Sequence, residues 1–284
     1  MIRLYDEYTH LTLDRRGFMA KLAKLSGSAA AAAAIVPMLA SDYAKAQIVP
    51  ADDPRLEIAD VVFPGPAGEV KGYLAIPADA SGPLPAVMVI HENRGLNPHI
   101  KDVTRRLALE GFVALGVDLL SRQGGTPPSD EEAAALFQSV DREGIVQDAV
   151  AGVAYLQEHP ASNGNVGAIG FCFGGGMVNQ LAVANPELDA GVAYYGGQPP
   201  ADQVDRIEAR LMLHYAGLDE RVNAGIAEYE EALKAAGVDY QLFIYDGAQH
   251  AFNNDTSEAR YNKEAADLAW SRTVAFLRET LTQS

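Results

Sequence analysis

The stretch that decides the fold is Val166–Gly176, which reads VGAIGFCFGGG. An apolar run ends in a tight, glycine-flanked turn, and a helix-like segment, Met177–Ala184, follows it. This order of strand, turn and helix is the context in which a nucleophile stands at the apex of a strained turn. Gly170 and Gly174 lie two residues before and after the apex, where β-carbons would prevent the backbone from closing. The apex residue is Cys172, the only cysteine of the chain.

This stretch has two other interpretations besides a turn that carries a nucleophile. Free cysteine is among the most buried residue types, so Cys172 could be a small apolar side chain in a glycine-rich turn. The strand–turn–helix context favours the nucleophile. A phosphate-binding glycine loop is disfavoured, because the run has no Gly-Lys-Ser/Thr ending and no G-x-G-x-x-G spacing.

Composition limits the class of protein and its partners. The chain has 284 residues, of which 48% are hydrophobic, enough for one large α/β domain or two small ones. A formal net charge of −16 argues against binding to nucleic acid or to an anionic membrane surface. One cysteine excludes an intramolecular disulfide and a cysteine-based metal site, and no metal site is expected.

Residues 1–46 predict an export signal of the twin-arginine type. Arg15-Arg16 precedes an apolar pair, and a run of small and apolar residues, Ser26–Ala40, follows. Ala44-Lys45-Ala46 forms an A-x-A cleavage site, so the mature chain is expected to begin near Gln47 and to be periplasmic. Without cleavage the chain would be cytoplasmic or tethered to the membrane.

A stable membrane anchor is not expected from this segment. The uninterrupted apolar stretch Ala29–Leu39 contains Pro37. It is also well short of the ~20 residues that a membrane-spanning helix needs.

The remainder predicts an irregular arm, residues 47–55, followed by one domain, residues 56–284. Leu56–Phe63 and Glu69–Ile76 read as an antiparallel hairpin at a sheet edge. Ala86–Ile90 is an apolar run typical of a strand buried on both faces. Helix and strand patterns then alternate as follows: Ile100–Glu110 helix, Phe112–Val117 strand, Arg142–His159 helix, Val166–Phe171 strand, Met177–Ala184 helix, Ala190–Tyr195 and Leu211–Tyr215 strands, Ala224–Ala236 helix, Tyr240–Tyr245 strand and Ala259–Leu281 helix.

This order predicts an α/β fold with a mostly parallel central sheet, an antiparallel N-terminal hairpin and helices on both faces. Active sites of such sheets form at the carboxyl ends of the strands. Cys172, Asp219 and His250 each follow a predicted strand there, in the chain order nucleophile, acid, histidine that α/β-hydrolases use.

Each partner of Cys172 also has an ordinary interpretation. Asp219 is a candidate turn or N-cap residue, and Asp246 is an alternative acid. His250 could be a solvated loop histidine. The common order and the placement at strand ends favour a triad.

Glu92 follows the strand Ala86–Ile90. The segment after this strand supplies one oxyanion donor in such folds, and the residue after the nucleophile supplies the other. Those backbone N–H groups would belong to Asn93 and Phe173. A carboxylate beside the site is unexpected, because it opposes formation of a thiolate.

These residues resemble those of the dienelactone hydrolases (carboxymethylenebutenolidases). The resemblance covers roughly residues 56–281 and rests on these segments: His91-Glu92, Asp118–Gln123 (DLLSRQ), Gly170–Gly175 (GFCFGG), Tyr194–Gly196 and His250–Phe252.

The resemblance implies an α/β-hydrolase fold, a Cys-His-Asp triad and no cofactor. By position, Cys172 is the nucleophile, His250 the base and Asp219 the acid that orients it. Glu92 matches the glutamate that interacts with the nucleophile in the resting enzyme and helps to activate it when substrate binds.

Substrate recognition is implied less completely. Arg122 matches one of two arginines that hold a substrate carboxylate, although an arginine in a glycine-rich loop is usually solvated. Asn254 stands where the family has the second arginine, and Arg260 lies farther on. Tyr195 lies at the end of a predicted strand and is expected to line the pocket, with core packing as the alternative.

The sequence therefore predicts a hydrolase that cleaves a small ester or lactone through a thioester of Cys172. The alternative is a catalytically inactive binding protein of the same fold for a small carboxylate ligand. A redox sensor is disfavoured because there is no resolving cysteine. The expected partner is a small-molecule substrate and not nucleic acid, and the oligomeric state is left open.

Overall fold

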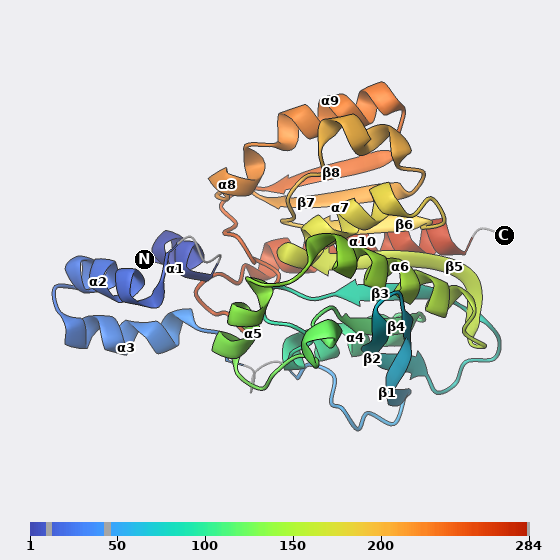
Figure 1. Ribbon diagram of the computed structural model, residues 1–284, viewed down its shortest axis with the longest axis horizontal. Helices are drawn as coiled ribbons and strands as arrows, with labels where there is room; N and C mark the ends of the chain where they lie inside the picture. Colours follow the sequence, from blue (N-terminus) through green and yellow to red (C-terminus); the bar gives the residue numbers. More distant parts are fainter. Residues whose placement is uncertain (10–12, 43–46, 283–284) are drawn as a thin grey trace.

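The computed structural model describes residues 1–9, 13–42 and 47–282. Its centre is an eight-stranded sheet with the order β1-β2-β4-β3-β5-β6-β7-β8 (Figure 1). The strands are β1 (Leu56–Gly65), β2 (Gly68–Pro77), β3 (Leu84–Ile90), β4 (Val113–Asp118), β5 (Ser162–Phe171), β6 (Ala190–Tyr194), β7 (Arg210–Ala216) and β8 (Tyr240–Tyr245).

The sheet has the predicted direction of strands. β1 and β2 pair antiparallel as a hairpin at one edge, and β2 pairs antiparallel with β4. Every other neighbouring pair, from β4–β3 to β7–β8, is parallel. The carboxyl ends of β3, β5, β7 and β8 therefore meet at one edge of the sheet, and this places the segments after them together.

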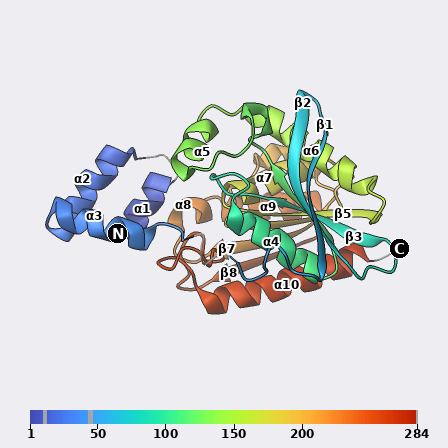
Figure 2. The same cartoon turned by 90° about the horizontal axis from the view of Figure 1, so that it is seen from below.

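Helices cover both faces of the sheet (Figure 2). They are α4 (Pro98–Leu109), α5 (Asp130–Phe137), α6 (Arg142–Gln157), α7 (Phe173–Ala184), α8 (Glu220–Asn223), α9 (Ile226–Ala236) and α10 (Lys263–Leu281), with short 3-10 helices η2 (Ser121–Gln123) and η3 (Ala201–Arg206). α6, α7 and α9 form one hydrophobic core, and α4 and α10 form the other. β3 divides its side chains between them, since Met88 and Ile90 face the first core and Val87 and Val89 the second.

Some helices differ from the sequence-based expectation, and α7, for example, begins at Phe173 rather than Met177. α10 begins at Lys263 rather than Ala259, because the Asn262 side chain accepts from the N–H of Ala265 and caps the helix there. α5 was not predicted; it is only 8 residues long and starts at the cap Ser129 in a polar segment with little apolar periodicity.

The N-terminal residues form α1 (Ile2–Thr9), α2 (Arg15–Ser26) and α3 (Ala29–Leu39), which lie beside α5 and α8 (Figure 1). The twin arginine begins α2, while the A-x-A cleavage motif lies outside the described residues. No single helix of the described chain is long and apolar enough to cross a membrane. α2 and α3 meet that criterion only as a pair, and a bend of 110° separates them.

Candidate active site

The turn between β5 and α7 has the strained geometry expected of a nucleophile elbow. Cys172 has φ 54° and ψ −113°, a conformation that side-chain-bearing residues rarely adopt. A Cβ on Gly170 would lie 2.1 Å from the carbonyl oxygen of Gly174, and a Cβ on Gly174 would lie 2.2 Å from that of Ile90. Both positions therefore require glycine, as the sequence predicts.

The elbow is fixed to its neighbours through the backbone. The N–H of Cys172 donates to the carbonyl of Tyr194 in β6 (3.0 Å), and the carbonyl of Cys172 accepts from the N–H of Gly176 in α7 (3.1 Å). The Cys172 side chain is partly exposed and lines a cavity. The thiol is thus accessible from that cavity and is not sealed inside the core.

His250 and Asp219 are joined at the same edge of the sheet. Nδ1 of His250 lies 2.5 Å from Oδ2 of Asp219, and both side chains are buried. The other oxygen of Asp219 accepts from the N–H of Val222 (3.2 Å) and caps α8. Asp219 therefore serves as an N-cap and as the partner of His250 at once, and the alternative acid, Asp246, is exposed.

The charge state of this pair follows from its surroundings. Burial would raise the pKa of Asp219, but the hydrogen bond and charge of His250, together with the Val222 N–H and the charge of Arg221, hold that pKa below its usual value. The Asp219 carboxylate is ionised at neutral pH and can stabilise a protonated imidazole.

A cavity of about 1080 Å³ brings most of the predicted site residues together. Its walls include Cys172, Phe173, His250, Asn93 and Tyr195. The cavity extends along α6 and α7 as far as η3. A space of this size is at the upper end of small-molecule sites.

Tyr195 covers the histidine from the β6 side. Its ring centroid lies 5.0 Å from that of His250, and the residue has φ 38°. The side chain is buried, and burial raises the pKa of its hydroxyl well above the usual value. The hydroxyl is therefore a neutral hydrogen-bond donor at every physiological pH.

Glu92 lines a second, smaller cavity of about 30 Å³ together with Cys172, His250 and Asn93. The amide of Asn254 donates to Oε2 of Glu92 at 2.8 Å. The oxygen of the same amide accepts from the N–H (3.1 Å) and the hydroxyl (2.6 Å) of Thr256, which fixes the direction of the amide. Asn254 thus holds the glutamate rather than a substrate.

His91 connects this segment to the loop after β4. Nδ1 lies 2.7 Å from the carbonyl of Glu92, and Nε2 accepts from the N–H of Leu119 at 3.1 Å. Burial lowers the pKa of His91, so the ring is neutral. Its neutral ring ties the residue after β3 to the residue after β4, a role that sequence reasoning did not assign.

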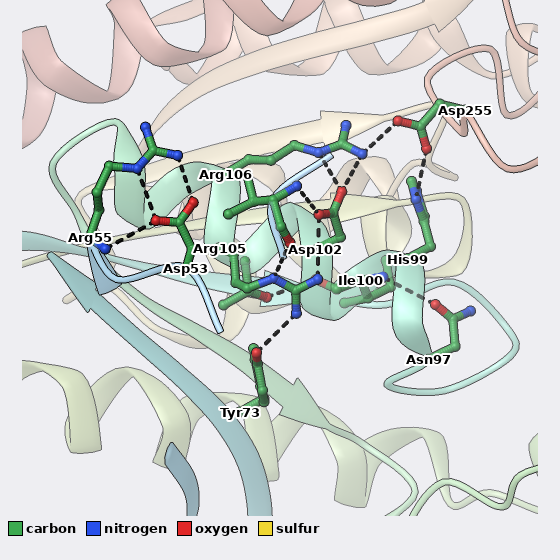
Figure 3. Close-up of polar contacts among 12 residues, drawn as sticks. Asp53, Arg55, Tyr73, Asn97, His99, Ile100, Asp102, Arg105, Arg106 and Asp255 are labelled. Carbon is green, nitrogen blue, oxygen red and sulfur yellow. Dashed lines mark hydrogen bonds and ion pairs between the residues drawn. The ribbon is translucent and has the colours of Figure 1, made fainter. Parts of the chain in front are cut away.

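An ion cluster on α4 anchors the loop that follows His250 (Figure 3). Asp255 lies 2.5 Å from Arg106 Nη2 and 3.2 Å from His99 Nδ1. Asp102 also accepts from Arg106, at 2.6 Å. Burial would raise the pKa of Asp255, but His99 and Arg106 lower it below its usual value. Sequence reasoning missed this cluster, because α4 and the loop are more than 140 residues apart.

Arg122 is placed differently from the sequence-based expectation of a substrate contact. Its Nε and Nη2 donate to the two oxygens of Asp148 at 2.6 and 2.9 Å, and Nη2 also donates to the carbonyl of Gly144. Arg122 does not line either cavity described above. Its donors are used to join the loop after β4 to α6.

Arg260 does not line the large cavity, but it lines the small cavity together with Glu92 and Cys172. Its Nε donates to the hydroxyl of Ser257 (3.0 Å), and its guanidinium lies 5.3 Å from the ring centroid of Tyr5. Among the residues that the structure describes, no group of three or more His, Cys, Asp or Glu side chains is arranged to hold a metal ion.

Comparison with known proteins agrees with this geometry. Residues 70–281 match the model of the "Dienelactone hydrolase family". A "Putative carboxymethylenebutenolidase" of Saccharolobus solfataricus is 32% identical over 77% of this chain and 97% of its own length. A "Probable 2-oxo-3-(5-oxofuran-2-ylidene)propanoate lactonase" of Bradyrhizobium is 34% identical over 77% of this chain and 93% of its own.

A solved structure shares the fold. The crystal structure of a dienelactone hydrolase-like promiscuous phosphotriesterase from metagenomic libraries superposes with a TM-score of 0.72 and 27% identity, covering 80% of this chain and 99% of its own. The eight-stranded, mostly parallel sheet is thus that of the α/β-hydrolase fold.

Proposed function

The chain belongs to the dienelactone hydrolase family of hydrolases, and from this premise we propose that it cleaves a small ester or lactone with Cys172 as nucleophile. One observation carries the proposal: the strained Cys172 turn and the buried His250–Asp219 pair line or border the same cavity. A nucleophile, a base and an acid that orients the base are the groups that acyl transfer needs.

In the acylation step, Nε2 of His250 takes the proton of the Cys172 thiol. The sulfur attacks the substrate carbonyl and forms the C–S bond, while Asp219 stabilises the imidazolium through Nδ1. The C–O bond then breaks, and the imidazolium returns the proton to the departing alkoxide. For a lactone, the released hydroxyl stays attached to the acyl group.

The backbone N–H groups of Asn93 and Phe173 are the proposed oxyanion donors. Both residues line the cavity beside Cys172. Phe173 is the first residue of α7, so its N–H has no acceptor within the helix. The start of a helix also favours a developing negative charge.

Deacylation uses the same histidine again. His250 removes a proton from water, the hydroxide adds to the thioester carbonyl, and the C–S bond breaks. The proton on the imidazole passes to the departing thiolate, so the enzyme returns to its starting state and a carboxylic acid is released.

Glu92 is proposed as the group that activates the nucleophile, as the family resemblance implies. It shares the small cavity with Cys172, and Asn254 holds one of its oxygens. Tyr195 is proposed to contact the substrate, since it lines the large cavity beside His250.

The proposal includes export. The twin arginine at residues 15–16 and the A-x-A motif at residues 44–46 support a periplasmic mature chain that begins near Gln47. N-terminal sequencing of the native protein from a fractionated host tests this: an intact Met1 terminus in the cytoplasmic fraction alone would contradict it.

The decisive experiment for the activity is hydrolysis of small lactones and aryl esters by the wild type and by Cys172→Ala. We expect kcat/KM of the alanine variant to fall at least about 10³-fold, because the step that forms the acyl-enzyme is lost. Cys172→Ser is the conservative variant for comparison, because it changes only the chemistry of the nucleophile. It keeps the shape of the turn, but its hydroxyl has a far higher pKa, so most of the activity should be lost there too.

Two outcomes would contradict the proposal. Undiminished hydrolysis by a folded Cys172→Ala variant would exclude the nucleophile. Absence of hydrolysis by the wild type, together with measurable binding of small carboxylates, would instead support an inactive binding protein of this fold.

A further inference from the structure

The N-terminal segment, which comprises the described residues 1–9 and 13–42, lies against the loops that carry the catalytic side chains (Figure 1). The carbonyl of Thr9, at the end of α1, accepts from Nδ2 of Asn93 in the loop after β3, at 2.5 Å. The N–H of Asp42, beyond α3, donates to the carbonyl of Thr256 in the loop after β8, at 2.7 Å. The segment is therefore tied to two different loops of the active site.

The small cavity beside Cys172 is closed by this segment. Tyr5, Thr9 and Ser41 form one of its walls. Tyr5 is buried, and its ring centroid lies 5.3 Å from the guanidinium of Arg260, which lines the same cavity. The enclosed volume of about 30 Å³ is the space of about one water molecule.

Cys172 lies between this small cavity and the large one. Cys172, His250 and Asn93 line both cavities, but the volume of the large cavity is about 1080 Å³. An ester has two parts, an acyl chain and an alkoxy group, which diverge from the carbonyl carbon that the sulfur attacks. The large cavity has space for one of them, and the small cavity is the other space that adjoins the sulfur. Only a very small group fits there while the segment is in place.

The segment is held to the rest of the chain by few contacts. Its buried apolar residues pack against one another, and of the described apolar residues that pack in this cluster only Ala259 lies outside the segment. Two ion pairs, Arg3 with Glu220 and Arg15 with Glu131, join it to the domain. All four side chains are exposed, and exposed ion pairs contribute little to stability.

The contact between α1 and the loops of the catalytic pair is also incomplete. A cavity of about 530 Å³ separates them, lined by Arg3 and Glu7 on one side and by Asp219 and His250 on the other. Unfilled space forfeits dispersion contacts. Neither of the two hydrophobic cores around the sheet contains a residue of the segment. The segment can therefore leave without disrupting the core of the domain.

We propose that the N-terminal segment limits which substrates the full-length chain hydrolyses. While it is docked, it closes the small cavity, so that esters with one very small part react and esters with two large parts react poorly. Removal of the segment, as in the export proposed above, opens this side of Cys172. The inference rests on the proposed ester hydrolysis and adds a limit on substrate shape and the residues that set it, Tyr5, Thr9 and Ser41.

A full-length protein with a site for a specific protease inserted after Ala46, produced without export, tests the proposal. Its activity is measured before cutting, and again after cutting and removal of the segment by gel filtration. We expect cutting to raise kcat/KM for phenyl phenylacetate, which has two large parts, by at least about 10-fold. Phenyl acetate has a small acyl part and methyl phenylacetate a small alkoxy part. For at least one of these two, kcat/KM should change by less than about threefold.

A pair of variants of the uncut protein tests the wall itself. Tyr5→Ala should raise kcat/KM for phenyl phenylacetate by at least about fivefold, because it removes the ring that closes the small cavity. Tyr8→Ala is the matched control. Tyr8 lies on the same helix and stacks on Phe18, with ring centroids 4.7 Å apart, but it does not line the small cavity. Its variant should stay within about twofold of the wild type. An equal rise in both variants would overturn the role given to Tyr5.

The outcomes separate this inference from the proposed function. If the three esters are hydrolysed in a Cys172-dependent manner and cutting leaves every kcat/KM unchanged, the limit set by the segment is wrong and the hydrolase stands. An equal rise for all three esters also overturns the limit on shape. Circular dichroism and thermal unfolding show whether the cut chain stays folded. If it unfolds or keeps the segment bound, Tyr5→Ala and Tyr8→Ala decide, and absence of all hydrolysis in both forms removes the proposed function itself.

Discussion

Two buried histidines show how different surroundings give the same side chain different chemistry. His250 faces the carboxylate of Asp219 at 2.5 Å, at the carboxyl edge of the sheet. His214 lies inside β7, with Nε2 3.1 Å from the hydroxyl of Thr273 and Nδ1 2.9 Å from that of Tyr245. A carboxylate stabilises an imidazolium, whereas neutral hydroxyls in the core do not.

The pKa of His214 reflects the absence of a carboxylate partner in the core. Burial, with a smaller contribution from Arg272, lowers that pKa to about 3. The imidazole therefore stays neutral in the folded protein at physiological pH, and its hydrogen bonds join β7, β8 and α10. Both rings are buried, but only His250 has a carboxylate as its partner.

The largest expected effect is on catalysis. If it is not observed, the comparison between His250 and His214 does not hold. His250→Gln should lower kcat/KM for a neutral aryl ester by about 10³-fold or more, because the base acts in both acylation and deacylation. His214→Gln should lower it by less than about tenfold in protein that is still folded. Equal losses in the two variants would show that the surroundings do not separate their roles.

The next effect is on stability and sharpens the comparison. The pKa of His214 is lowered on folding from the ordinary value of about 6.5, so the unfolded chain binds the proton more readily. Its contribution to stability is fully present above pH 6.5 and is lost as the pH falls toward 3. Between these limits, each unit by which the pH falls lowers the contribution of His214 to the free energy of unfolding by roughly 1.4 kcal/mol.

Denaturant unfolding of the wild type and His214→Gln between pH 4 and 7 measures this contribution. The variant should be less stable at pH 7, and the difference between the two proteins should shrink as the pH falls. A difference that is constant with pH would show that folding does not change the pKa of His214.

The smallest effect concerns Arg122, a charged side chain that, like His250, is paired with a buried carboxylate. Arg122→Gln should lower the free energy of unfolding by about 2 kcal/mol, because it leaves the buried Asp148 carboxylate without its charged partner. The kcat/KM for small esters should stay at the wild-type value, since Arg122 lines neither the large nor the small cavity. Thermal or denaturant unfolding measures the stability, and hydrolysis of small aryl esters with and without a free carboxylate measures kcat/KM. A fall in kcat/KM with unchanged stability would show that Arg122 contacts the substrate.

The sequence was sufficient for the parts of the molecule that depend on local spacing. The apolar runs predicted the strands, and the glycines around Cys172 predicted the elbow, because a strained turn leaves no alternative residue there. Asp219 and His250 were found through their place after strands, and the structure joins them by a hydrogen bond.

Contacts with partners that are distant in sequence could not be predicted. Arg122 was predicted to contact the substrate, and its pairing with Asp148, 26 residues away on α6, could not be read from the sequence. Asn254 looked like a missing arginine, but it bonds to Glu92, 162 residues earlier. A pattern of residue types states what a side chain is able to bind and not which neighbour the fold presents to it.

The tight packing around the elbow has a consequence for how this site can change. Carbonyl oxygens occupy the space on which a methyl group at Gly170 or Gly174 would intrude. Gly170 and Gly174 therefore cannot be replaced without moving the backbone. The Cys172 side chain at the apex, in contrast, faces the cavity. New chemistry on this scaffold has to enter through the single side chain at the apex or through the cavity walls, while the loop that presents it stays as it is.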